Sequence, residues 1–127
     1  MGQWRAAVDL PAEPGGPRAA RRVVAALLDV WDLAELSDDA QLVVSELVAN
    51  AYRHASGSGP FELEVIGRSD GVRIALADGS AIHPVVKEPS LDRLTGRGMA
   101  LVAAVAAGWG AEDRRGGKRV WVDLVAS

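Results

Sequence analysis

The chain has 127 residues and a formal net charge of −3 at pH 7, with 49% hydrophobic and 24% charged residues. This balance predicts one ordinary globular domain over residues 1–127, and it lacks the strongly basic character of a nucleic-acid-binding protein. The absence of cysteine excludes disulfides and thiolate metal sites. No apolar run is long enough to cross a bilayer and the N-terminus lacks a signal-peptide core, so we expect a cytoplasmic protein without a membrane partner.

The N-terminal half predicts one strand followed by two helices. Apolar and polar side chains alternate over residues 4–10, which is the two-residue period of a strand. Apolar residues then recur at helical spacing over residues 23–31, after Pro17, which suits the first turn of a helix. A second helix is expected to begin with Ser37 as its N-cap and to run to about His54.

The C-terminal half predicts two hairpins separated by a third helix. Residues 61–66 and 72–77 alternate in polarity around a turn at residues 69–71. A helix follows Gly98, and a last hairpin turns at residues 115–117. The fold class is therefore expected to be α+β: a two-layer sandwich of about five mostly antiparallel strands, covered on one face by three helices.

Polar residues on the second helix form the first candidate site. Glu46 and Asn50 lie four residues apart, and Arg53 follows two helical turns after Glu46, so all three share one helix face with small Ala49 between them. The Glu46 carboxylate could accept a proton from a hydroxyl or water beside a phosphate, and the Asn50 amide oxygen could be a ligand of Mg²⁺. A solvated helix face explains the same residues, and His54 fits a structural hydrogen-bonding role near the helix end.

Two further segments carry possible ligand contacts. Asp78 continues the two-residue period of a buried strand, where its carboxylate needs donors such as an adenine amine; a cap on the following turn is the alternative. The segment of residues 95–98 precedes the Met99 helix, and glycines before a helix start suit phosphate, although a plain tight turn uses the same residues. Near the C-terminus, we expect Lys118 and Arg119 to be ordinary surface charge.

The order of these segments resembles the GHKL superfamily of ATP-binding proteins, which includes histidine-kinase catalytic domains and gyrase-type ATPases. The matching runs are SELVANAYRHA, ADGS, TGRGMALV and GWG with GGKRVWVDL, and they cover the chain from about residue 19 to residue 124. The closer resemblance is to stand-alone anti-sigma-factor serine kinases. This resemblance implies the GHKL (Bergerat) fold, with ATP and Mg²⁺ as cofactors.

The resemblance also implies a role for each matching position. Asn50 would hold Mg²⁺ against the phosphates, Glu46 would activate the attacking hydroxyl, and Asp78 would accept the adenine amino group. The other positions assigned to the nucleotide site are Arg53, His54, Gly79, Ser80, Gly96, Arg97, Gly98 and Met99. The implied activity is transfer of the ATP γ-phosphate to a serine of an anti-sigma antagonist, with a sigma factor as a second protein partner.

The chain departs from the family pattern in two places. Asp78-Gly79-Ser80-Ala81 lacks the later glycines of the first glycine motif, and the loop over residues 81–94 is short and free of glycine. A poor lid admits water and impairs phosphoryl transfer more than binding, so a nucleotide-binding interaction module without catalysis is the alternative function. The apolar residues of the first strand also suggest a homodimer, although a monomer is equally compatible with them.

Overall fold

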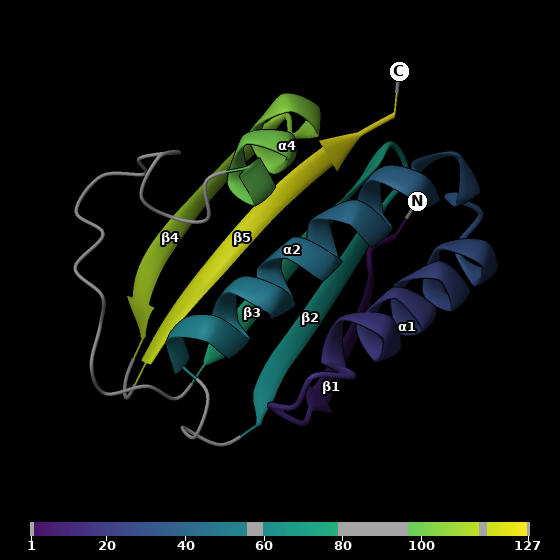
Figure 1. The fold of residues 1–127 in the computed structure, drawn as a ribbon. Helices are drawn as coiled ribbons and strands as arrows, with labels where there is room; N and C mark the ends of the chain where they lie inside the picture. The colour runs from purple at the N-terminus through teal and green to yellow at the C-terminus, as the bar shows by residue number, and fades with distance from the viewer. Residues whose placement is uncertain (1, 56–59, 79–96, 115–116, 127) are drawn as a thin grey trace.

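The computed structural model describes residues 2–55, 60–78, 97–114 and 117–126. The elements in chain order are β1 (Trp4–Leu10), α1 (Gly16–Val30), the 3₁₀ turn η1 (Ala34–Leu36), α2 (Ser37–Ala55), β2 (Phe61–Arg68), β3 (Gly71–Asp78), α4 (Arg97–Val105), β4 (Gly108–Arg114) and β5 (Gly117–Val125). The strands form one sheet in the order β1-β2-β3-β5-β4, and each of its pairings is antiparallel. The three α-helices cover one face of this sheet (Figure 1), which confirms the expected α+β sandwich.

The core lies between the helices and the sheet because each element has one apolar side. On α2, Val43, Leu47 and Val48 recur at helical spacing, and each is at most 3% exposed. On β2, Phe61, Leu63 and Val65 alternate with more exposed residues and are at most 1% exposed. No helix in these described stretches combines the length and the apolarity needed to span a bilayer.

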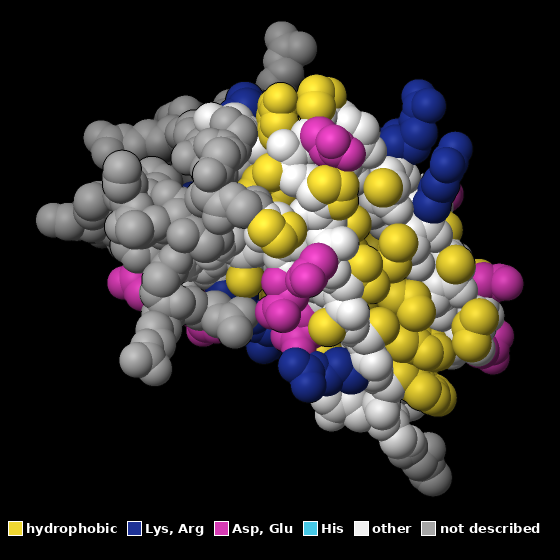
Figure 2. All heavy atoms as spheres, turned by 90° about the horizontal axis from the view of Figure 1, so that it is seen from below, with side chains coloured by type: hydrophobic (Ala, Val, Ile, Leu, Met, Phe, Trp, Pro, Cys, Tyr) yellow, Lys and Arg dark blue, Asp and Glu magenta, His cyan; other side chains and the backbone are white. Residues whose placement is uncertain are grey.

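Tryptophan side chains join the far end of α1 to the sheet. Trp31 stacks on Trp4 of β1 with ring centroids 6.2 Å apart, and a Cβ added at Gly67 of β2 would lie 2.6 Å from the Trp31 ring. Gly67 is therefore the residue that lets this indole approach the strand. Trp4 and Val30 stay 41% and 79% exposed, and Figure 2 shows hydrophobic side chains gathered on the side of the molecule where α1 and β1 lie in Figure 1.

The start of α2 differs from the sequence prediction. Ser37 was expected to be an N-cap with non-helical backbone, but it has helical angles (φ −61°, ψ −43°) and is the first residue of α2. The preceding turn η1 leads directly into the helix, so Ser37 lies one position too far along the chain to cap it. Its hydroxyl instead accepts a hydrogen bond of 3.0 Å from Gln41 Nε2.

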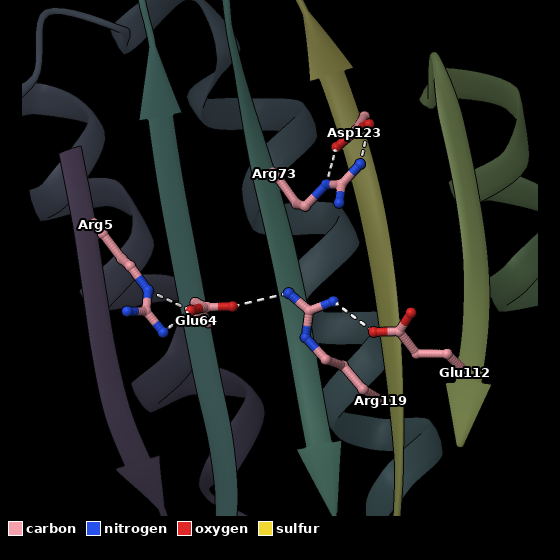
Figure 3. A network of polar contacts seen from close by, with 6 residues as sticks. All are labelled: Arg5, Glu64, Arg73, Glu112, Arg119 and Asp123. Carbon is pink, nitrogen blue, oxygen red and sulfur yellow. Dashed lines mark hydrogen bonds and ion pairs between the residues drawn. The ribbon is translucent and has the colours of Figure 1, made fainter. Parts of the chain in front are cut away.

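The sheet face away from the helices carries a chain of ion pairs (Figure 3). Glu64 on β2 accepts hydrogen bonds from Arg5 on β1 and, at 2.8 Å, from Arg119 on β5. Arg119 also donates to Glu112 on β4 at 3.0 Å. Partial burial favours a higher pKa for the Glu64 carboxyl, but the hydrogen bonds from Arg119 and Arg5 outweigh burial and lower its pKa. The chain of contacts therefore links strands from one edge of the sheet to the other.

A second polar cluster on this face pairs β3 with β5. Arg73 lies directly opposite Asp123 and donates two hydrogen bonds to its carboxylate, at 2.7 and 2.9 Å. The hydrogen bond from Arg73 lowers the pKa of Asp123. The Arg73 guanidinium also lies 4.4 Å from the centre of the Trp121 ring. Arg73 therefore contacts Trp121 and Asp123 together and fixes the register of these two strands.

The Arg73–Asp123 pair predicts an acid-sensitive contribution to stability. Because the pKa of Asp123 is lowered in the folded protein, this contribution is present above the ordinary Asp value of 3.8 and is lost as the pH falls through the folded value. We expect Arg73→Met to lower the free energy of unfolding at pH 7 and to flatten its decrease at acid pH. Urea unfolding at a series of pH values measures both effects.

The matched control for this experiment is Arg18→Met, because the Arg18 side chain is exposed on α1. It should leave the acid dependence of the free energy of unfolding unchanged. An Arg73→Met protein that loses stability with the same steepness as wild type would contradict the assignment.

Candidate functional site

Asn50 is a polar residue placed inside an apolar helix face. It lies on the same side of α2 as Val43 and Leu47, since these positions are separated by one and two helical turns. Only 7% of Asn50 is exposed, and its Oδ1 atom is buried without a hydrogen-bond partner in the described part of the structure. An unsatisfied buried oxygen costs about 1–3 kcal/mol, so this arrangement favours an incoming donor or cation over core packing.

Asp78 places a carboxylate on the sheet face that the helices cover. It ends β3 on the face that carries Val72, Ile74 and Leu76, all of which are at most 4% exposed. The Asp78 side chain is 3% exposed, and its Oδ2 lies 4.0 Å from Nζ of Lys118, which is opposite to it on β5. A buried carboxylate beside an ammonium group can accept hydrogen bonds from the donor edge of a ligand.

Lys118 and Arg119 correct the sequence prediction of ordinary surface charge. Their side chains are only 15% and 14% exposed. Lys118 lies on the helix-covered face with Asp78, whereas Arg119 lies on the opposite face between Glu64 and Glu112. The sequence held a signal for Lys118, because it has the same two-residue spacing as the buried Val122 and Leu124.

The third predicted segment reaches the described structure at the start of α4. This helix begins at Arg97, so Gly98 and Met99 also lie in its first turn, where backbone N–H groups have no partner inside the helix. α4 packs against α2, which carries Asn50, and its residue Val102 is fully buried. The two helices lie side by side over the sheet (Figure 1), so the start of α4 is on the same side as Asn50 and Asp78.

The other predicted site residues fall in three groups. Glu46 is half-buried and Arg53 is exposed, both on α2 beside Asn50. His54 lies in the last turn of α2, but its side chain is outside the description, as are the side chains of Arg97 and Met99. The remaining positions, Gly79, Ser80 and Gly96, lie outside the described residues.

The described groups define the chemical character of the site. An acceptor carboxylate with a neighbouring ammonium lies at the end of β3, an amide oxygen lies on α2, and the start of α4 has backbone N–H groups without a partner inside the helix. The first pair suits the polar edge of a base, and the other two suit a cation and the phosphates that it binds. A five-stranded antiparallel sheet covered by helices on one face is the fold expected of an ATP-binding domain of GHKL type.

Comparison with known families identifies the chain. The family model described as the histidine kinase-like ATPase domain matches residues 10–124, and the chain belongs to this family. It is accordingly an ATP-binding protein of GHKL type, as its resemblance to that superfamily implied. None of the curated protein sequences matches the chain.

The partnerless Asn50 oxygen predicts a conflict between stability and binding. We expect Asn50→Leu, which has a similar volume and no polar atom, to raise the free energy of unfolding of the ligand-free protein by about 1 kcal/mol. The same change should abolish the thermal stabilisation by Mg-ATP. Urea unfolding without ligand and thermal melting with ligand measure the two effects.

Asn50→Asp serves as the control for this experiment, because a second acceptor at the position should lower the stability of the ligand-free protein. If Asn50→Leu destabilises the ligand-free protein, the amide has a structural role and the interpretation is wrong.

Proposed function

We propose that the protein is a cytoplasmic regulator with protein serine kinase activity of the anti-sigma-factor type. It would transfer the γ-phosphate of ATP to a serine of an anti-sigma antagonist and would also sequester a sigma factor. The observation that carries the nucleotide site is the buried Asn50 oxygen without a partner, on a helix that packs against both β3 and α4. The kinase subtype rests on the sequence resemblance.

The base end of the proposed site is built around Asp78. Its buried carboxylate would accept a hydrogen bond from the adenine amino group, a contact that a buried acceptor strongly favours. Gly79 would let the backbone pass close to the base, because glycine has no Cβ to meet the ring. Ser80 stands where the family often has a glycine, and its side chain would narrow the pocket on that side.

The phosphate end of the proposed site combines a cation ligand with a helix start. Asn50 would contribute its Oδ1 to Mg²⁺, which bound there would neutralise phosphate charge and draw its remaining ligands from phosphate and water. Gly96, Gly98 and Met99 would present backbone N–H groups to phosphate oxygens at the positive end of α4. Arg97 would add a positive charge.

Glu46 is the proposed general base. It lies one turn before Asn50 on α2 and is half-buried, so it would reach a hydroxyl positioned beside the γ-phosphate. Its carboxylate would accept the proton of the serine hydroxyl as the serine oxygen bonds to phosphorus and the bond from phosphorus to the bridging oxygen breaks, releasing ADP. Arg53 and His54 would be the basic residues at the end of the segment that contains Glu46 and Asn50.

A nucleotide-binding module without catalysis is the second candidate function. The observation that favours it is that the run Asp78-Gly79-Ser80-Ala81 lacks both later glycines of the family pattern and that the sequence over residues 81–94 contains no glycine. In this case nucleotide occupancy would tune a protein interface without phosphoryl transfer. Wild-type protein that binds ATP and phosphorylates no candidate antagonist would support it.

The proposed mechanism predicts different defects for two substitutions on α2. Glu46→Ala should keep ATP affinity and lower phosphoryl transfer by at least about 100-fold, because only the transfer step uses the base. Asn50→Ala should weaken Mg-ATP binding by at least about tenfold and lose transfer. Isothermal titration with Mg-ATP measures affinity, and radiolabelled phosphate transfer to candidate antagonists measures activity.

Glu35→Ala, which removes an exposed carboxylate in the turn before α2, is the matched control and should behave like wild type. Normal transfer by Asn50→Ala would refute the assignment of Asn50.

We also propose that β1 pairs with β1 of a second copy of the chain. Within the described residues, β1 is an outer strand of the sheet: it pairs with β2 on one side and with no strand on the other side. Antiparallel pairing centred on Ala7 would place Arg5 opposite Asp9 and Trp4 opposite Leu10, so the strand is complementary to itself. This match in charge and apolarity supports a continuous sheet across the dimer.

The charges on β1 make the dimer testable. Light scattering after size exclusion should give twice the 13.3 kDa chain mass for wild type and the monomer mass for Asp9→Arg, since Arg5 would then face a like charge. A monomeric wild type, or an Asp9→Arg dimer as strong as wild type, would exclude this interface.

A further inference from the structure

The Asp78–Lys118 pair supplies the proposed nucleotide site with a donor as well as an acceptor. We infer that this pair lets the site accept guanine nucleotides in addition to adenine nucleotides, with Lys118 as the residue that determines the specificity. The inference rests on the proposed nucleotide site and concerns only its base end.

The two side chains are held together by the sheet. Asp78 and Lys118 are directly opposite in the β3–β5 register, and both lie on the face covered by the helices. Their side chains are 3% and 15% exposed, and the oxygen and nitrogen atoms are 4.0 Å apart. This separation exceeds a normal hydrogen bond, so the two groups attract each other by charge, and a carboxylate has two oxygens that can accept from more than one donor.

The edges of the two purines explain why a lysine changes specificity. Adenine presents an amino donor beside a ring-nitrogen acceptor, so Asp78 would accept from the amine and Lys118 would face the ring nitrogen. Guanine presents a carbonyl oxygen beside two N–H donors. Asp78 would then accept from these N–H groups, and Lys118 would donate to the carbonyl oxygen, a common contact between lysine and guanine.

Lys118 is essential for guanine because of where the guanine carbonyl would lie. With its neighbouring N–H bound to Asp78, the carbonyl oxygen would be next to a buried carboxylate, where two acceptors repel each other. A buried acceptor left without a donor is strongly penalised, and sites discriminate sharply on such groups. The Lys118 ammonium, held near Asp78 by charge, removes that penalty.

Arg119 offers a matched control on the same strand. It is the next residue, carries the same charge and is equally buried, at 14% side-chain exposure. Its side chain lies on the opposite face of the sheet, where it donates hydrogen bonds to Glu64 and Glu112. A change at Arg119 therefore tests the effect of lost charge and lost stability without touching the base end of the site.

Isothermal titration with Mg-ADP and Mg-GDP tests the inference. Wild type should bind the two diphosphates with dissociation constants within about tenfold of each other. Lys118→Met, which keeps the length of the side chain and removes its charge, should favour ADP over GDP by at least a further tenfold. Arg119→Met should keep the wild-type ratio, and circular dichroism should show that both variants are folded.

Inosine diphosphate provides a second readout on unmodified protein. Hypoxanthine keeps the carbonyl oxygen and its neighbouring N–H, so wild type should bind Mg-IDP within about tenfold of Mg-ADP even if the Lys118 variant fails to fold. A preference of 100-fold or more for ADP over both GDP and IDP would overturn the inference and leave the proposed ATP site intact. Failure to bind any of the three would refute the proposed function itself.

Discussion

The burial of polar oxygen atoms between the helical layer and the sheet is the constraint on which this molecule depends. Asn50 and Asp78 are the buried polar residues of the described chain, and every side chain around them on α2 and β3 that is buried is apolar. The Asp78 carboxylate lies 4.0 Å from the Lys118 ammonium, whereas the Asn50 Oδ1 loses its water on folding and has no hydrogen-bond partner in the described residues. The fold therefore gives up stability at the place where a nucleotide would restore it.

Ion pairs on the sheet face away from the helices help to hold Asp78 and Lys118 in position on the helix-covered face. On β3 and β5, the Arg73–Asp123 pair lies on the open face, and the Asp78–Lys118 pair lies on the helix-covered face of the same two strands. A slip of one residue between these strands would turn Lys118 away from the helices. The bidentate ion pair that fixes the register thus also keeps Asp78 and Lys118 opposite each other.

The fold was predictable because its signals are local. Alternation in the strands, the apolar stripe of α2 and the turn before Gly71 each involve neighbouring residues, and each was confirmed. The burial of Asp78 followed from the two-residue period of its strand, whereas the burial of Asn50 was not predicted, because the helical period groups it with the polar Glu46 and Arg53. The ion-pair chain from Arg5 to Glu112 could not be predicted, because it depends on a strand order in which β5 inserts between β3 and β4. The prediction for Lys118 was wrong because residues beside a hairpin turn are usually exposed, whereas its two-residue spacing from Val122 and Leu124 places it on the helix-covered face.

If α2, β3 and the start of α4 enclose one purine nucleotide, Mg-ATP should stabilise the folded protein, and thermal melts with and without Mg-ATP measure this stabilisation. At a ligand concentration about 100 times the dissociation constant, binding adds roughly 2.7 kcal/mol of stability, which raises the melting temperature by several degrees. We expect this rise for wild type and its loss in Asp78→Asn, as enclosure of a nucleotide by these three elements requires. A wild type that melts at the same temperature with and without Mg-ATP, or an equal rise in Asp78→Asn, would contradict it.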